Sequence, residues 1–276
     1  MSLADRPNSA TLHEKYRPGF GCRDDDPLQA ELNALYGYPD DLETKVLHRS
    51  RLNLFHAVMS RLVARGVVRD FRRALDLGCN AGYYSKMLSD FGFEDVLGVD
   101  IEPEFVSRAQ DHFASARPGE RREFRVQDAE QLEERDAFSF ILCTEVIEHT
   151  SHPDRVIDNL AKSLVPGGIA VVTLPNRNSI PYAWAMTVHA LKRKPYEPVL
   201  RDHLSWPMTR SVRLLEPYGF ELLETTGANL FLTGSMIRAG YGRPGFATIH
   251  RLNDTLSRLG PLHYFSQFFF AIWRKP

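Results

Sequence analysis

A turn between two glycines, in the stretch "ALDLGCNAGYYS" from Ala74 to Ser85, is the first feature of the sequence that could hold a ligand. Gly78 and Gly82 would let the backbone approach a bound molecule closely. A dinucleotide site has a third glycine between them, because the pyrophosphate needs a helix start clear of side chains, but this chain has Asn80 there. A cofactor without phosphates, such as S-adenosylmethionine, needs only backbone contact and the partial positive charge of the helix start for its carboxylate. The turn therefore favours a phosphate-free cofactor.

Two acidic residues follow the turn at positions that suit the rest of such a cofactor. Asp100 ends the apolar run "DVLGVD", 22 residues after Gly78. Its carboxylate has only acceptors, and two vicinal ribose hydroxyls offer two donors, so a bidentate contact is expected. Asp100 also suits the simpler role of capping the helix that follows at Pro103. Asp128, in "VQDAEQL", would accept a hydrogen bond from the adenine amino group.

The segment "EVIEH", Glu145 to His149, carries side chains that could act on a substrate. On a helical turn, Glu145, Glu148 and His149 would lie at positions i, i+3 and i+4, on one face. Two carboxylates and an imidazole could hold a divalent cation, magnesium or manganese by the oxygens, or iron or zinc by the imidazole. Alternatively, Glu145 caps the turn and the other two shape a pocket, with His149 as a general base. His203, in "RDHLSWP", could be a further ligand or base.

Alternating strand and helix patterns must position these residues. Helices are expected from Tyr83, Glu104 and Asp154, between the strands "RALDL", "DVLGVD", "EFRVQ", "FSFILC" and "IAVVTL". This alternation predicts an α/β, doubly wound, mostly parallel sheet with right-handed crossovers. The "VPGG" stretch, residues 165–168, would end the last of these helices and turn the chain. A helix from Thr209, a strand "FELLETT" and a buried final strand in "FSQFFFAIWRK" complete the pattern.

Other segments lie outside this alternation. Residues 1–44 are rich in Pro, Gly and Asp without a sustained period, which predicts an irregular N-terminal arm before a domain of residues 45–276. Apolar positions at helical spacing from Leu47 predict an amphipathic helix ahead of the first strand. Segments of about 176–206 and 228–262, the second an insertion between the last two strands, are expected to cover the substrate. The basic run from Lys192 to Lys194 in the first of them is expected to be a solvated turn.

The composition excludes several classes of protein. The 276 residues include 34 basic and 35 acidic side chains, so there is no global excess of positive charge for nucleic acid. Three scattered cysteines form no CxxC pair, which excludes a zinc-cysteine site and fits a reducing compartment. No apolar run reaches the roughly 18 residues of a membrane span, and the N-terminus has no apolar signal core. We expect a cytoplasmic protein with no membrane span and leave its oligomeric state open.

Five motifs, in this order, resemble those of the class I S-adenosylmethionine-dependent methyltransferases: "LDLGCNAGYYS", "VLGVDIEPEFVSRAQ", "VQDAEQL", "FILCTEVIEHTSHP" and "LVPGGIAVVTLPNR". Within that superfamily, "EVIEH", "TLPNRNS" and "LHRSR" (Leu47 to Arg51) are most similar to the O-methyltransferases of ubiquinone biosynthesis. The resemblance covers roughly residues 45–227 and implies S-adenosylmethionine as the cofactor. Together with the alternation, it predicts a Rossmann-like sheet of seven strands with an antiparallel final strand and helical or loop lid insertions.

The expected cofactor contacts follow from the turns and from the resemblance. An Arg in the "LHRSR" segment contacts the cofactor in the similar enzymes, so Arg51 is expected to do so here, with Arg49 as the alternative. The whole expected set is Arg51, Asp76, Gly78, Asn80, Gly82, Asp100, Ile101, Asp128, Ala129 and Thr144.

The expected reaction is methyl transfer to a hydroxyl of a small aromatic or apolar molecule. Glu145 and His149 are the expected catalytic residues, and Glu145, Glu148 and His149 would be the ligands if magnesium or another divalent cation assists. An N- or C-methyltransferase of a small metabolite is an alternative. A further one is an RNA ribose 2'-O-methyltransferase, because "HLSWPMT" resembles a stretch of the small-RNA enzymes, although no basic stripe precedes the core.

Two readings from other classes are weaker. An NAD-dependent oxidoreductase would share the fold and Asp100, but it should have a third glycine at Asn80 and a catalytic Tyr/Lys or His/Asp arrangement. A non-catalytic binding module is disfavoured because the turn, the ribose carboxylate and the acidic cluster are all intact.

Overall fold

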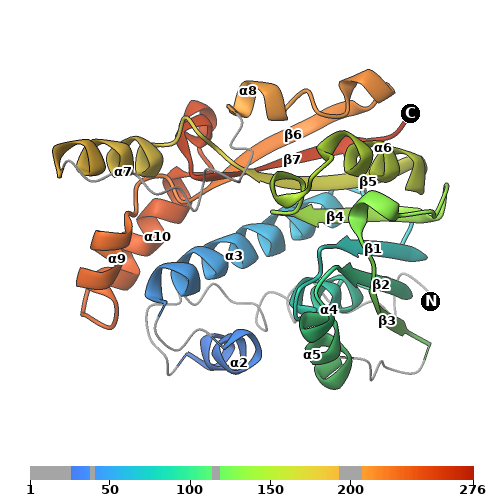
Figure 1. Cartoon of the computed structure of the whole chain (residues 1–276), viewed down its shortest axis with the longest axis horizontal. Helices are drawn as coiled ribbons and strands as arrows, with labels where there is room; N and C mark the ends of the chain where they lie inside the picture. Colours follow the sequence, from blue (N-terminus) through green and yellow to red (C-terminus); the bar gives the residue numbers. More distant parts are fainter. Residues whose placement is uncertain (1–25, 38–40, 114–118, 193–206) are drawn as a thin grey trace.

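The computed structural model describes residues 26–37, 41–113, 119–192 and 207–276. Its centre is a seven-stranded sheet in the order β3-β2-β1-β4-β5-β7-β6 (Figure 1). The pairs from β3 to β5 are parallel, and β7 is antiparallel to both β5 and β6. The predicted α/β fold with an antiparallel final strand is therefore confirmed. The strands are β1 (Arg73–Leu77), β2 (Asp95–Asp100), β3 (Arg121–Val126), β4 (Phe138–Thr144), β5 (Leu164–Pro175), β6 (Glu221–Ala228) and β7 (Phe268–Arg274).

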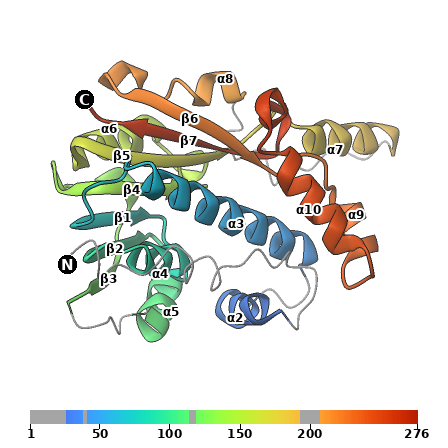
Figure 2. The ribbon, with the colours of Figure 1, turned by 180° about the vertical axis from the view of Figure 1, so that it is seen from behind.

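Two hydrophobic cores, one on each face of the sheet, hold the helices. Successive side chains of a strand point to opposite faces, so Phe140 of β4 lies in one core and Ile141 in the other. The first core contains α3 (Leu42–Ala64), α4 (Tyr83–Asp90) and α5 (Pro103–Phe113), and Figure 2 shows α3 running along the back of the sheet. The second contains α6 (Pro153–Ser163) and α8 (Met208–Ser211), together with the turns η2 (Ala129–Gln131), η3 (Ile147–His149) and η4 (Glu216–Tyr218) near it. A sheet buried on both faces explains why its strands read as continuous apolar runs.

The predicted irregular arm is wrong for residues 27–36, which form helix α2 (Pro27–Tyr36). The Asp26 side chain accepts a hydrogen bond from the Gln29 backbone N–H, Pro27 occupies the first turn, and Gly37 ends the helix at φ 61°. These are standard start and stop signals, which a search for long apolar periods overlooks in a ten-residue helix. The helix expected from Leu47 also begins earlier, at Leu42, behind the cap Asp41.

The "VPGG" stretch is not the predicted turn. Helix α6 ends at Ser163, and residues 165–168 already belong to β5, where the pairing with β4 shifts between Phe138 and Phe140. Gly167 has φ 76° and its N–H donates to the carbonyl of Lys275. The glycines therefore allow the strand to bulge and still find a partner. The helix expected from Thr209 is only the single turn α8.

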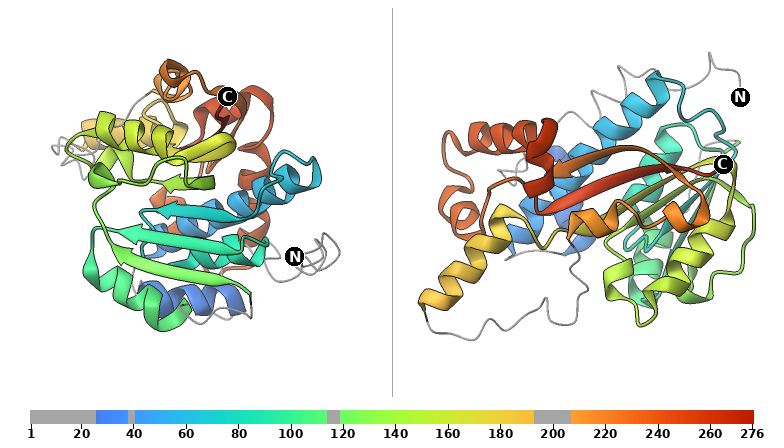
Figure 3. Two further views of the ribbon diagram at one scale, coloured as in Figure 1. Left: turned by 90° about the vertical axis from the view of Figure 1, so that its right-hand side faces the viewer. Right: turned by 90° about the horizontal axis from the view of Figure 1, so that it is seen from above.

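The two predicted lid segments emerge from one edge of the sheet. Strands β5 and β6 run toward that edge and β7 starts from it. The segment after β5 forms α7 (Ile180–Leu191), and the insertion before β7 forms α9 (Gly234–Gly240), α10 (Phe246–Leu256) and η5 (Gly260–Phe265). Figure 3 shows these helices gathered beyond one end of the strands. Within the described ranges, none of the helices has the length and apolar character needed to cross a bilayer.

Candidate active site

A cavity of about 640 Å³ lies where β1, β2, β3 and β4 end. Parallel strands bring their carboxyl ends to one edge of a sheet, which is where open α/β sheets bind ligands. Its described lining comes from residues 36–151, with α2 and α3 on one side and the turns after the four strands on the other. Neither described lid segment contributes to it, so their role over the substrate stays a prediction. The predicted site residues that line the cavity are Arg51, Gly78, Asn80, Asp100, Ile101, Asp128, Ala129, Thr144, Glu145 and His149.

The turn after β1 shows how Asn80 replaces a glycine. Asn80 has φ 47°, in the left-handed region that Asn tolerates better than most residues. Its side-chain oxygen accepts a hydrogen bond from the Ala81 N–H at 2.7 Å, and its own N–H donates to Asp100 Oδ2 at 2.8 Å. The turn is therefore closed by the carboxylate of the neighbouring strand instead of by a further glycine.

The two glycines of the turn serve different neighbours. A Cβ on Gly78 would lie 2.2 Å from Val146 Cγ2, so the glycine makes room for the loop after β4. A Cβ on Gly82 would lie 2.9 Å from Ala109 Cβ and from the Phe124 ring. Gly82 does not line the cavity, and its expected contact with the cofactor stays a prediction. Its absence of a side chain lets α4 pack closely on α5 and β3.

Asp100 is fixed by two backbone groups on opposite sides. Its Oδ2 accepts from the Asn80 N–H, and its Oδ1 accepts from the Glu102 N–H at 3.0 Å. A carboxylate has about four acceptor positions, so each oxygen keeps capacity for one further donor. The role of Asp100 as a turn cap is therefore compatible with its predicted role as a ribose acceptor. Ile101 beside it is 60% exposed and offers an apolar surface at the cavity.

Asp128 and Ala129 form the cavity wall after β3. The Asp128 side chain caps η2 by accepting from the Glu130 N–H at 2.9 Å. The amide of Asn159 in α6 donates to the Ala129 carbonyl at 3.1 Å and ties this wall to the second core. Both contacts hold the wall in place, and Asp128 retains acceptor capacity beyond its cap.

Asp76 is not among the residues that line the cavity, and its expected direct contact with the cofactor stays a prediction. Its side chain is fully buried, and Oδ2 accepts a hydrogen bond from Ser85 Oγ at 2.6 Å. The other carboxylate oxygen has no partner among the described residues. Burial is the main cause that raises the pKa of Asp76 to about 7, while the Ser85 hydroxyl acts in the opposite direction.

Glu145 is oriented by β5 and by α3. Its backbone N–H donates to Thr173 Oγ1, and that hydroxyl donates to Glu145 Oε1, both at 3.1 Å. The guanidinium of Arg51 lies 3.7 Å from Glu145 Oε2 and 4.5 Å from the centre of the Phe268 ring. Burial raises the pKa of Glu145, against the effects of Arg51 and Thr173. Arg49 instead points away and pairs with Asp26 at 3.0 Å, so Arg51 is the arginine that reaches the cavity.

Glu145, Glu148 and His149 do not form the single helical face that was expected. Glu145 has φ 53° and lies outside the short helix η3, because its side chain turns toward Thr173. Glu148 is 2% exposed, whereas the His149 side chain is 48% exposed, with its Nε2 3.9 Å from Glu148 Oε1. No group of three His, Cys, Asp or Glu side chains within the described ranges is arranged to hold a metal ion. The residues present therefore do not fit the divalent cation, and no chemical step below depends on it.

Glu148 nevertheless has an unusual environment. Neither of its carboxylate oxygens has a hydrogen-bond partner in the described part of the chain. Burial, followed by the charge of Glu145, raises the pKa of Glu148 well above its usual range. The cavity-lining imidazole of His149 thus has a buried acidic group behind it.

Several cavity residues were missed from the sequence. Tyr36 of α2, Thr44 and His48 of α3, and Tyr84 of α4 line the cavity together with Glu145 and His149. Tyr36 and His48 meet edge to face with ring centroids 4.6 Å apart. Burial lowers the pKa of His48 to about 3, so this imidazole is neutral. The capping signals of α2 would have revealed the helix that brings Tyr36 here. His203 lies outside the described residues.

Comparison with known proteins agrees with this geometry. Residues 47–225 match the family model described as a methyltransferase domain. The ubiquinone biosynthesis O-methyltransferase of Xanthomonas axonopodis pv. citri (strain 306) is 33% identical over 146 residues, 52% of this chain and 57% of that protein. The protein of the same name from Coxiella burnetii (strain Dugway 5J108-111) is 29% identical over 136 residues, 49% of this chain and 57% of that protein. The chain thus spans little more than half the length of these relatives.

Solved structures share the fold at low identity. The magnesium protoporphyrin IX methyltransferase of Synechocystis PCC 6803, with bound S-adenosylhomocysteine, superposes with a TM-score of 0.62 at 16% identity, covering 92% of this chain and 96% of that one. The [4+2]-cyclase SpnF superposes with a TM-score of 0.57 at 19% identity, covering 98% of both chains. The second likeness shows that this fold alone does not fix the reaction. The matched residues include the four strand ends that build the cavity, and the chain belongs to the methyltransferase domain family.

Proposed function

We propose that the protein transfers a methyl group from S-adenosylmethionine to a hydroxyl of a small aromatic or apolar molecule. The observation that carries the proposal is one cavity with two chemically different walls. We call Asp100 with the turn of Asn80 the first wall, and Arg51, Glu145 and His149 the second wall; all of them line the cavity. The names of the relatives support oxygen as the acceptor atom. The cytoplasm remains the predicted location, which the free, buried thiols of Cys79 and Cys143 suit.

The first wall fits the nucleoside part of the cofactor. The Asp100 carboxylate has one unused acceptor position on each oxygen, which matches the two hydroxyl donors of a ribose. The exposed side chain of Ile101 and the wall at Ala129 offer apolar contact for a base. Arg51, which lines the cavity from α3, supplies a positive charge for the cofactor carboxylate.

The second wall fits a hydroxyl acceptor. Tyr36, His48 and Tyr84 offer aromatic surface, and burial raises the pKa of the Tyr84 phenol, so this group stays protonated. His149 is the group best placed to remove the acceptor proton, because its ring is half exposed at the cavity. The imidazolium that forms when His149 takes the proton would face the carboxyl group of Glu148, whose Oε1 lies 3.9 Å from His149 Nε2.

The bound cofactor supplies a methyl group on a sulfonium, which is already a good leaving group. The protein has to align the acceptor, exclude water and accept one proton. Asp100 and the turn around Asn80 hold the cofactor, and with it the methyl group, in place. The hydrogen bonds between Glu145 and Thr173 fix the loop that carries His149. The hydroxyl oxygen of the acceptor becomes the ether oxygen of the product, and its proton passes to His149.

Calorimetry with S-adenosylhomocysteine and a mass-spectrometric screen of methylated phenols, sugars and lipids test the proposal. We expect micromolar or tighter cofactor binding and a product heavier by one methylene group. A chelator should leave turnover unchanged, because the acidic cluster is not arranged as a metal site; loss of turnover that added magnesium restores would contradict this. Binding of a nicotinamide dinucleotide in place of S-adenosylhomocysteine would overturn the proposal itself.

A further inference from the structure

Most of the exposed large apolar side chains of the described chain belong to the two lid segments. Eleven of the fifteen such residues lie on α7, α9, α10, η5 and the adjoining turn. We call this set the lid-end surface, and it comprises Ile180, Trp184, Met186, Leu191, Met236, Ile249, Leu252, Leu259, Leu262, Tyr264 and Phe265. Monomeric proteins rarely expose so many large apolar groups in one region unless that region binds something.

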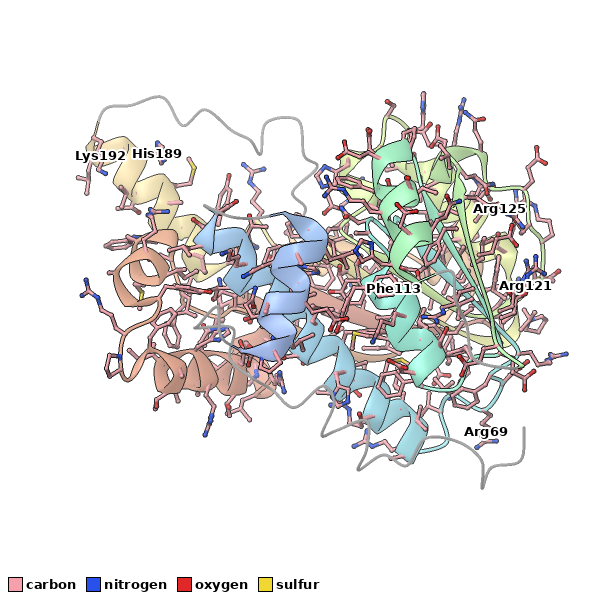
Figure 4. All side chains as sticks on the ribbon, turned by 90° about the horizontal axis from the view of Figure 1, so that it is seen from below. Arg69, Phe113, Arg121, Arg125, His189 and Lys192 are labelled. Carbon is pink, nitrogen blue, oxygen red and sulfur yellow. The ribbon has the colours of Figure 1, made fainter. Side chains whose placement is uncertain are left out.

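Helix α7 is the clearest part of this surface. Its sequence, "IPYAWAMTVHAL", is apolar on every side, a pattern typical of a helix that is covered all round. In the structure only Pro181 of this helix is buried, and Trp184 and Leu191 are 53% and 80% exposed. Figure 4 shows His189 and Lys192 at its free tip, at the opposite end of the molecule from Arg121 and Arg125. The helix therefore presents apolar surface that no described element covers.

The exposed charges in the described parts of these segments are of one sign. Across residues 176–192 and 229–267 the exposed ionic side chains are Arg177, Lys192, Arg238, Arg243 and Arg251. The single carboxylate in these ranges, Asp254, is buried against Ser50. Arg238 has Glu43 of α3 at 3.5 Å, so its charge is partly balanced from outside. The lid-end surface is therefore apolar and basic, although the whole chain has a formal charge of −1.

We propose that the lid-end surface docks on an anionic lipid membrane. A bilayer interface accepts Trp, Leu and Phe side chains near its acyl boundary and attracts Arg and Lys to its headgroups. A second copy of the chain would bring one basic surface against another, which disfavours a symmetric dimer through this face. The docking is peripheral, since none of the described helices can span a bilayer.

The topology gives the docked molecule a defined orientation. The lid segments leave the sheet at the carboxyl ends of β5 and β6, the same edge at which β1 to β4 form the cavity. A membrane at this surface would therefore lie on the cavity side of the sheet. An apolar acceptor could pass between the bilayer and the cavity without crossing bulk water, although docking itself requires no acceptor and does not depend on the proposed reaction.

Co-sedimentation of the full chain with vesicles tests the proposal. Vesicles of phosphatidylglycerol mixed with phosphatidylcholine should bind the protein, pure phosphatidylcholine should bind it weakly, and salt should release it. The Trp184 fluorescence should shift to shorter wavelength on binding. Trp273 is already buried and Trp206 lies outside the described residues, so Trp184→Phe identifies the source of the shift.

Matched variants separate docking from folding. Trp184→Ser should weaken vesicle partitioning roughly ten-fold or more, and Arg243→Ser and Arg251→Ser should weaken it about five-fold each. Arg121→Ser, on the far edge strand, and Tyr218→Ser, 39% exposed on η4, should leave it unchanged. Circular dichroism and cofactor binding verify that each variant is folded. Equal binding to both vesicle types, no binding to either, or a dimer in sedimentation velocity that Leu252→Glu dissociates would overturn the proposal.

Discussion

Replacement of Asp100 by Ala gives the most direct test of the cofactor wall. The carboxylate has two unused acceptor positions, and each hydrogen bond to a charged group contributes about 1.5–3 kcal/mol. Because the residue is partly exposed, water replaces part of that loss, and we expect binding to weaken by about 2–4 kcal/mol, or roughly 30-fold to 1000-fold in Kd. Calorimetric titration with S-adenosylhomocysteine measures the change.

The same carboxylate also closes the turn through the Asn80 and Glu102 N–H groups, so weaker binding alone does not prove a ribose contact. A thermodynamic cycle that combines the Asp100→Ala variant with a modified ligand separates the two effects. The native protein should bind an S-adenosylhomocysteine analogue without ribose hydroxyls much more weakly than the natural ligand, whereas Asp100→Ala should bind both with similar affinity. If the variant loses affinity for both ligands by the same factor, the carboxylate only shapes the turn and our assignment is refuted.

Three further predictions concern catalysis and stability. His149→Gln should lower kcat about 10²- to 10⁴-fold with unchanged Kd for S-adenosylhomocysteine; an unchanged kcat would show that another group takes the proton. Burial raises the pKa of Asp76 from 3.8 to about 7, so the folded state binds the extra proton and loses up to about 4 kcal/mol of stability as pH rises between those values. Urea unfolding of Asp76→Asn should therefore show a smaller loss from pH 5 to pH 8 than the native protein, and equal losses would contradict the assignment. Asp26→Ala should destabilise the fold by about 3–4 kcal/mol, because it removes both the cap of α2 and the carboxylate that lies 3.0 Å from the buried guanidinium of Arg49. Asp26→Asn keeps a cap and should lose less; equal losses of the two variants in chemical denaturation would place the whole effect in the ion pair with Arg49 and none in the cap.

The sheet was predictable because its strands and helices alternate with strong local patterns. The seven-residue run of β4 and the stretch "RALDL" of β1, which is followed by Gly78, are recognisable without any knowledge of their partners. The misplaced elements depend on weaker signals. Helix α2 has ten residues and is recognised by its cap Asp26 and by Pro27, and the "VPGG" bulge depends on the pairing of β5 with β4, which the local sequence does not show.

The cofactor side of the site was predictable for a related reason. Asp100 and Thr144 end strands, and the topology of a parallel sheet brings strand ends together whatever the side chains are. Asp76 and Gly82 do not line the cavity, and the spacing of a motif does not say which side of a strand faces a cavity. Leu77, one residue further along β1, does line the cavity. The Asp76 side chain points to the other face of the strand, where its carboxylate accepts a hydrogen bond from Ser85 of α4.

The residues expected around the methyl acceptor are positioned by contacts between segments far apart in the sequence, which no local sequence pattern shows. Three consecutive residues of α3 reach three different parts of the molecule, because neighbours on a helix point about 100° apart. Arg49 pairs with Asp26 of the N-terminal arm, Ser50 hydrogen-bonds to His250 of α10 at 2.7 Å, and Arg51 faces Glu145 at the cavity. Helix α3 therefore connects the arm and the lid to the second wall of the cavity through adjacent side chains. None of the described lid residues lines the cavity. A change that shifts α10, such as docking at the lid-end surface, would nevertheless act on Ser50 through its hydrogen bond to His250. Because Arg51 is the next residue of α3, such a shift would also affect its position at the cavity.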